Sequence, residues 1–195
     1  MAQINSSFGY KITWFALKDV MIDTILVHNP NFTNAAETTW EKGLMAAERS
    51  IDKVFLSGSY DGWAFLVGVG LPDPSQMESL MPLLQKLGEL AKEVCYFSSH
   101  RIVSSYGFAR VVQGCLTRLY GYSGEQGHVY ANIGERTEAE KNLSLNFSTN
   151  DSELFAEGFD EIDEEHIIQL AEQWSLDPDN LFGMEEQECV IADIN

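Results

Sequence analysis

Residues 106–133 read YGFARVVQGCLTRLYGYSGEQGHVYANI, and this stretch decides the fold. Aromatic and β-branched residues dominate it, with breaks at Gln113-Gly114 and Gly124–Gly127. Such residues favour strands, and short breaks that contain glycine favour hairpin turns. The stretch therefore predicts three consecutive antiparallel strands, over residues 106–112, 116–122 and 129–133.

Working outward, four earlier segments have the same strand character: residues 10–16, 53–56, 63–69 and 94–97. Between them, apolar residues at helical spacing predict helices over residues 18–28 and 35–49 and after residue 73, although residues 18–28 could also form a strand. Asp73 is predicted as the N-cap of the third helix. Thr137 begins a capping-box sequence, which predicts a short helix.

Residues 163–174 read DEEHIIQLAEQW and predict an amphipathic helix. Asp163 is the expected N-cap, and acids in the first turn are favoured by the helix dipole, by about 0.3–1 kcal/mol each. The apolar stripe that should dock this helix consists of Ile167, Leu170, Ala171 and Trp174.

These elements predict one α+β domain over residues 1–195. We expect an antiparallel sheet of about five to seven strands, with helices packed on one face or at its ends. Residues 151–195 should form an acidic C-terminal helical region packed on that domain.

The charge is distributed unevenly along the chain. The formal net charge is −18, and residues 151–195 contain fifteen Asp or Glu and no Lys or Arg. A negative field of this strength repels nucleic-acid phosphates and anionic membrane surfaces, and attracts basic partners or cations. We therefore expect a protein partner, without nucleic acid or membrane. The N-terminus lacks the pattern of a secretory signal, which predicts a cytoplasmic protein.

Motifs for cofactor chemistry are incomplete. Gly68 and Gly70 begin a dinucleotide-binding pattern, but Asp73 stands where the third glycine is needed. Residues 177–188 have acids at the first, third and twelfth positions of a calcium loop, but Phe182 replaces its essential glycine. The four histidines form no metal-binding pair. No cofactor is predicted, and a looser calcium site stays open.

One cluster could support catalysis. Ser99, His100 and Arg101 follow one another at a strand end, where they could serve as nucleophile, base and anion clamp. Adjacent residues on a strand point to opposite faces, however, so Ser99 and His100 are poorly placed to bond each other. A polar sheet edge is the alternative interpretation.

Tyrosines and a phenylalanine alternate along the opening stretch, at residues 106, 108, 120, 122 and 130. One face of such a sheet belongs to the core. The other could form a tyrosine-rich binding surface, because interfaces favour tyrosine.

Several segments together resemble those of small bacterial proteins: GWAFLVG (62–68) with Leu71-Pro72, FSSHR (97–101), YGYSGE (120–125) and AEQWSLDP (171–178). In size and acidity the chain is similar to immunity proteins, which bacteria make to neutralise secreted polymorphic toxins. The resemblance implies a cytoplasmic inhibitor, without enzymatic activity, that binds the basic toxin domain of a secreted effector.

On this hypothesis, the partner-binding residues are the acids on and before the C-terminal helix: Glu157, Asp160, Glu161, Asp163, Glu164, Glu165 and Glu172. Two alternatives stay open. One is an acidic module that binds another protein or a cation. The other is a small hydrolase with its site near Ser99, His100 and Arg101.

Overall fold

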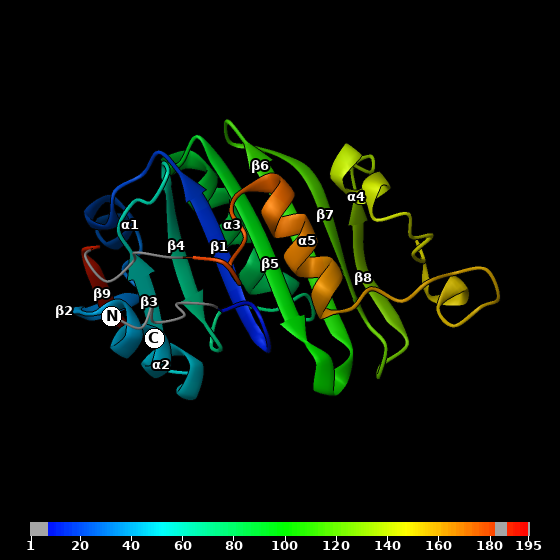
Figure 1. Ribbon diagram of the computed structural model, residues 1–195, viewed down its shortest axis with the longest axis horizontal. Helices are drawn as coiled ribbons and strands as arrows, with labels where there is room; N and C mark the ends of the chain where they lie inside the picture. Colours follow the sequence, from blue (N-terminus) through cyan, green and yellow to red (C-terminus); the bar gives the residue numbers. More distant parts are fainter. Residues whose placement is uncertain (1–7, 182–186, 195) are drawn as a thin grey trace.

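The computed structural model describes residues 8–181 and 187–194. Within them, nine strands form one antiparallel sheet in the order β2-β9-β3-β4-β1-β5-β6-β7-β8 (Figure 1). The strands are β1 (Ile12–Lys18), β2 (Phe32–Thr38), β3 (Lys53–Ser57), β4 (Trp63–Gly68), β5 (Glu93–His100), β6 (Ser105–Val112), β7 (Cys115–Ser123), β8 (His128–Ile133) and β9 (Cys189–Ile194).

Helices connect the strands of the described chain. The α-helices are α1 (Ile22–His28), α2 (Trp40–Arg49), α3 (Met77–Leu90), α4 (Glu138–Asn142) and α5 (Glu164–Trp174). Two short 3-10 helices are η1 (Arg101–Val103) and η2 (Asp151–Glu153).

The sheet has a core on each face. On one face, α2, α4 and α5 pack over a mainly aromatic cluster that includes Trp14, Phe97 and Phe108. On the other face, α1 and α3 pack over a mainly aliphatic cluster that includes Leu66 and Leu84. Figure 1 shows α5 crossing in front of the sheet and α3 behind it.

The α+β class and the seven strands predicted from sequence are confirmed, but the predicted strand count is wrong. The two additional strands are β2 and β9. β2 is an edge strand whose middle residues are exposed, so its sequence lacks the apolar pattern of a strand. Its last four residues, Ala35–Thr38, were predicted as the start of the helix over residues 35–49. β9 lies between β2 and β3, so its pairing depends on residues far away in the chain.

The prediction of helices on one face or at the ends is also wrong, because helices cover both faces. The physical reason is visible in β4, where all six residues are buried. A strand that is apolar along its whole length needs cover on both sides.

The predicted helix starts are partly confirmed. Thr137 makes the expected capping box at α4, and Asp163 caps α5. α3, however, begins at Met77 after Gln76 instead of at Asp73. Asp73 Oδ1 instead accepts a hydrogen bond from the Ser75 backbone N–H at 2.7 Å, which stabilises a separate turn.

Candidate partner-binding face

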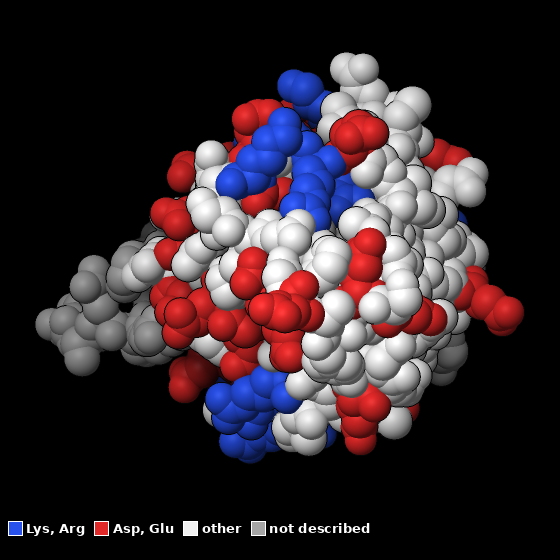
Figure 2. All heavy atoms as spheres, turned by 90° about the vertical axis from the view of Figure 1, so that its right-hand side faces the viewer, with Lys and Arg blue, Asp and Glu red and all other residues white. Residues whose placement is uncertain are grey.

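The seven acids predicted to bind a partner lie on α5 and on the segment that leads into it. Glu164 is partly covered, and the other six are exposed: Glu157, Asp160, Glu161, Asp163, Glu165 and Glu172. Figure 2 views the molecule from the β8 end of the sheet. Asp and Glu side chains gather across the middle of this view, whereas Lys and Arg side chains gather above and below them.

Two of these acids hold the local backbone. Asp163 Oδ1 accepts a hydrogen bond from the His166 backbone N–H at 3.0 Å, as an N-cap should. Asp160 Oδ2 accepts from the Asn146 backbone N–H at 2.8 Å. Both carboxylates therefore shape the chain that carries the others.

Glu164 meets the residues of the predicted catalytic cluster. Its Oε2 lies 3.6 Å from Arg101 Nη1, and the Ser99 hydroxyl is 3.5 Å from its Oε1. His100 lies on the other face of the sheet, with Nε2 3.5 Å from Thr13 Oγ1, and burial lowers its pKa. The structure thus brings Ser99 and Arg101 together at Glu164 and keeps His100 away from Ser99, as the alternation of a strand requires.

The remaining four acids are Glu157, Glu161, Glu165 and Glu172. None of the hydrogen bonds or ion pairs among the described residues involves their carboxylates. Glu165 and Glu172 are seven residues apart and so lie on the same side of α5. These four charges are free to meet a partner.

Two further acids join α5 in space. Burial raises the pKa of Tyr10, and the nearby carboxylates of Asp179, Glu165, Glu164 and Asp177 raise it further. Asp177 and Asp179 belong to the loop after α5, which the backbone of Phe8 contacts through a 3.1 Å hydrogen bond to Pro178. We call Asp177 and Asp179, together with Glu157, Glu161, Asp163, Glu164, Glu165 and Glu172, the acidic face.

Asp177 and Asp179 were not predicted as site residues. Their position on the acidic face depends on how residues 8–10 pack against this loop and α5. The only signal in the sequence was the lack of basic residues after Asp151.

The field of the acidic face also reaches Tyr106. Burial raises its pKa to about 12, and Glu164, Asp163 and Glu161 contribute to the increase, while Arg101 opposes it. Carboxylates that act on one phenol must lie close together.

Large apolar side chains are exposed beside these charges. Ile102 is 83% exposed at the tip of η1, Phe155 is 62% exposed in the segment before α5, and Tyr10 is 45% exposed. Ile102 directly follows Arg101, which contacts Glu164. Apolar and aromatic anchors next to a charged rim are typical of protein interfaces.

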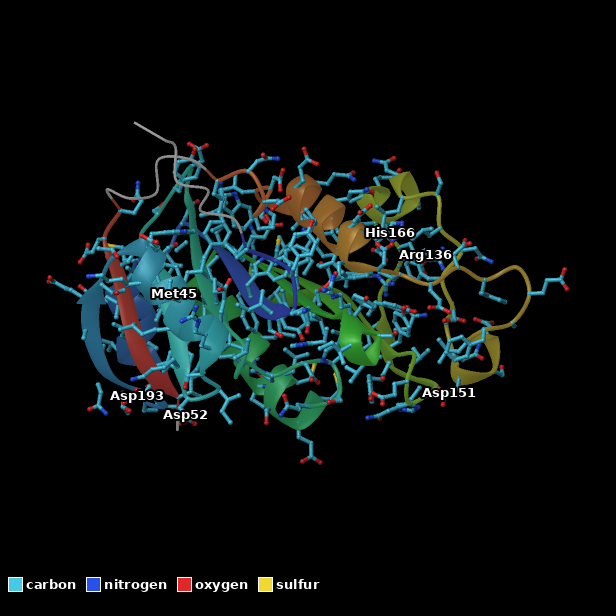
Figure 3. All side chains as sticks on the ribbon, turned by 60° about the horizontal axis from the view of Figure 1, so that its bottom comes forward. Met45, Asp52, Arg136, Asp151, His166 and Asp193 are labelled. Carbon is cyan, nitrogen blue, oxygen red and sulfur yellow. The ribbon has the colours of Figure 1, made fainter. Side chains whose placement is uncertain are left out.

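Not all acids of the C-terminal region belong to this face. Asp151 accepts a hydrogen bond from the Val129 backbone N–H at 2.7 Å and pairs with His128. Asp193 in β9 pairs with Lys53. Figure 3 shows Asp193 at the opposite end of the molecule from Asp151, with His166 on α5 between the two ends.

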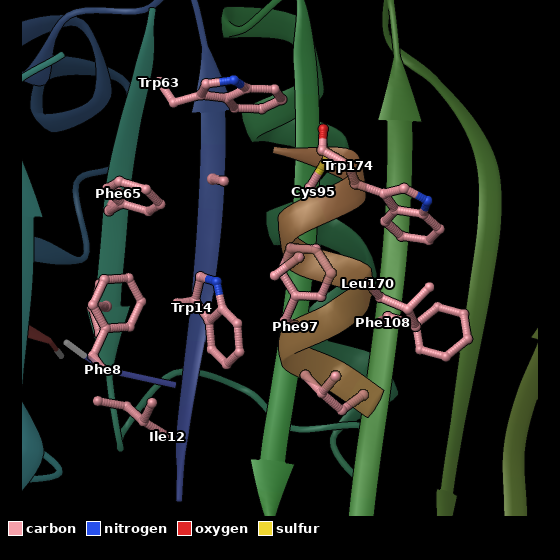
Figure 4. Packing of buried hydrophobic residues seen from close by; sticks show 14 of the residues in the cluster. Phe8, Ile12, Trp14, Trp63, Phe65, Cys95, Phe97, Phe108, Leu170 and Trp174 are labelled. Atoms are coloured by element: carbon pink, nitrogen blue, oxygen red, sulfur yellow. The ribbon is translucent and has the colours of Figure 1, made fainter. Parts of the chain in front are cut away.

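α5 is a rigid support for its carboxylates. Its predicted apolar stripe is confirmed, because Ile167, Leu170, Ala171 and Trp174 are all buried. Figure 4 shows Leu170 and Trp174 packed over Phe97 and its neighbours on the sheet. Burying a leucine or isoleucine side chain contributes about 1.5–3 kcal/mol, so the helix is anchored strongly.

The tyrosine-rich sheet face does not form a binding surface. Tyr106, Phe108, Tyr120 and Tyr122 are all buried in the core beneath α5 and the segment around Phe147. The core-packing interpretation is therefore confirmed for these four. Tyr130 on β8 lies outside the core, is half-buried, and donates its hydroxyl to Gln126 Oε1 at 2.7 Å.

The opposite face of the molecule has a cavity of about 510 Å³ between the end of α1 and α3. Phe32, Leu71, Pro82 and Leu83 form apolar parts of its lining, and Lys86 also lines it. No acid of the acidic face lines it.

No group of three or more His, Cys, Asp or Glu side chains within residues 8–181 and 187–194 could hold a metal ion. Residues 182–186 of the calcium-like loop lie outside the described residues, and Asp177 in its first position accepts hydrogen bonds from Asp179 and Asn180. No helix in the described chain is both long and apolar enough to cross a membrane.

Comparison with family models, with curated proteins and with solved structures returns no match for this chain.

Proposed function

We propose that this protein is an inhibitor of the immunity type, which binds the basic catalytic domain of a secreted bacterial toxin through the acidic face and acts in the cytoplasm. The observation that supports this most is that four exposed carboxylates have no bonding partner among the described residues. Glu157, Glu161, Glu165 and Glu172 are exposed and make no hydrogen bond or ion pair with another described residue.

Their setting suits association with a basic surface. A fixed array of like charges steers a partner of opposite charge and raises its association rate. Because α5 is anchored by buried side chains, the backbone that carries Glu165 and Glu172 needs little ordering on binding. The same field repels phosphate, so a protein partner is favoured over a nucleic acid.

The test is a calorimetric titration with the toxin domain encoded immediately upstream of this chain's gene. The test variant replaces the four free acids by glutamine: Glu157→Gln, Glu161→Gln, Glu165→Gln and Glu172→Gln. A matched control neutralises four exposed acids far from the acidic face: Glu37→Gln, Asp52→Asn, Glu78→Gln and Glu89→Gln. Each variant removes four negative charges and so changes the formal net charge from −18 to −14.

We expect the test variant to bind at least about tenfold more weakly and the control to bind like the unmodified protein. Equal losses in the two variants would mean that only the overall charge matters, which contradicts a specific face. An upstream gene without a toxin domain would contradict the immunity-type function.

A further inference from the structure

A smaller cavity, of about 230 Å³, opens between β7 and the segment that leads into α5. Its lining includes the aromatic residues Tyr122, Phe155 and Phe159 and the acidic residues Asp160 and Glu161. No Lys or Arg lines it. Aromatic and acidic groups therefore face the same space without a cation.

The polar groups of this cavity are only partly used by the fold. Tyr122 is buried and donates its hydroxyl proton to the Ile162 carbonyl at 2.7 Å, so it closes the inner end of the cavity and offers no donor. Asp160 uses Oδ2 to accept from the backbone at 2.8 Å. Glu161 makes no hydrogen bond or ion pair with another described residue. The cavity thus offers hydrogen-bond acceptors and aromatic faces.

The size of the cavity limits what can enter. Pockets for small-molecule ligands usually measure about 300–1,000 Å³, and this one is smaller. It has room for a single long side chain. Glu161 also belongs to the acidic face, so a side chain in the cavity would come from a partner bound there.

We propose that this cavity receives an arginine side chain of the basic partner, a proposal that rests on the proposed function. A planar guanidinium can stack on aromatic rings and at the same time bond to a carboxylate, whereas a lysine ammonium acts as a point charge. Arginine in a pocket near the interface is a frequent source of binding energy. In this proposal the Phe155 ring stacks on the guanidinium, and the Glu161 carboxylate bonds to it.

The experiment is an NMR titration of the full chain with N-acetyl-arginine amide. The matched probe is N-acetyl-citrulline amide, which has a similar shape and no charge. We expect the arginine probe to shift the backbone amide signals of residues 155–161 saturably and the citrulline probe to leave them unchanged. Equal binding of both probes, or shifts confined to the cavity between α1 and α3, would overturn the proposal.

Single-residue variants distinguish binding inside the cavity from attraction by the overall negative charge. Phe155→Ala and Glu161→Gln should each weaken the arginine probe about fivefold. Glu157→Gln removes the same charge from an exposed residue of the same segment that does not line the cavity, and should change the affinity by less than about twofold. Equal losses for Glu157→Gln and Glu161→Gln would overturn the proposal.

The toxin domain distinguishes this proposal from the function on which it rests. Phe155→Ala leaves every charge in place, so any loss of toxin affinity in this variant measures the contribution of the cavity. If Phe155→Ala binds the toxin normally while the variant with four neutralised acids does not, the arginine pocket is wrong and the inhibitor function stands. If neither change affects toxin binding, both are wrong.

Discussion

Replacing Glu140 by glutamine should destabilise this protein more than any other single change of charge that we describe. Arg118 and Glu140 have fully buried side chains. Arg118 Nε lies 2.9 Å and 3.0 Å from the two carboxylate oxygens, and Nη2 lies 2.8 Å from Oε1. The substitution leaves a buried guanidinium without its counter-charge.

The magnitude follows from the surroundings of Arg118. Its Nη1 has the Asn132 side chain at 2.8 Å and the Ile133 carbonyl at 3.0 Å, so some hydrogen bonds survive the change. Those dipoles do not replace a full negative charge. Breaking a buried pair by removing one partner costs about 3–5 kcal/mol, a large share of the roughly 5–15 kcal/mol that stabilises a folded domain.

Glutamine isolates the charge because it can keep the other role of Glu140. The Thr137 backbone N–H donates to Glu140 Oε2 at 2.9 Å, and an amide oxygen can accept the same bond. Glu138→Gln is the matched control on the same helix. Glu138 is 83% exposed and pairs with Lys141 at 2.6 Å, so its loss should leave the stability unchanged within error.

The assay is equilibrium unfolding in urea, with the slope against urea compared between variants. We expect the midpoint to fall strongly for Glu140→Gln at an unchanged slope. A loss below about 1 kcal/mol, or equal effects of Glu140→Gln and Glu138→Gln, would refute the reasoning.

Three other changes have defined outcomes. Asp163→Ala should cost about 0.5–2 kcal/mol by removing the cap of α5, which corresponds to a fall of roughly 2–4 °C in Tm for each kcal/mol, whereas Asp163→Asn should restore most of it in a thermal scan. Burial lowers the pKa of His100 below its ordinary value of 6.5, although Asp73 opposes this, so the folded state binds the proton less readily than the unfolded state. The free energy of unfolding should therefore fall as the pH drops below about 6.5. His100→Gln should reduce that loss when urea titrations at about pH 7.5 and about pH 5 are compared. Gly70→Ala should destabilise by about 1–3 kcal/mol because its Cβ would overlap the Ile51 carbonyl oxygen, and an unchanged urea midpoint would contradict that close approach.

The strands predicted correctly from the sequence were those whose own residues show the aromatic and β-branched pattern of a strand. β6, β7 and β8 follow one another through short turns, so each local pattern agrees with the final pairing. β9 pairs with Ser57 in β3 and with Thr38 in β2, two contacts that no local pattern encodes. The same non-local pairing explains why β2 was missed.

The candidate site divides in a similar way. The cap at Asp163 and the buried stripe of α5 could be predicted because both depend on neighbouring residues. The pairing of Glu164 with Arg101 could not, because β5 and η1 bring that arginine to α5 from elsewhere in the chain. Nor could the exposure of Phe155, since an aromatic residue is usually assigned to the core.

The most direct test of the acidic face is the hydrogen-exchange footprint of the complex with the toxin domain. The first backbone N–H groups of α5, including those of Glu164 and Glu165, have no partner within the helix and should exchange fast in the free protein. We predict that toxin binding slows exchange at residues 155–161 and 163–168 and leaves α3 unchanged. Slowed exchange at α1 and α3, with none at the start of α5, would contradict the account.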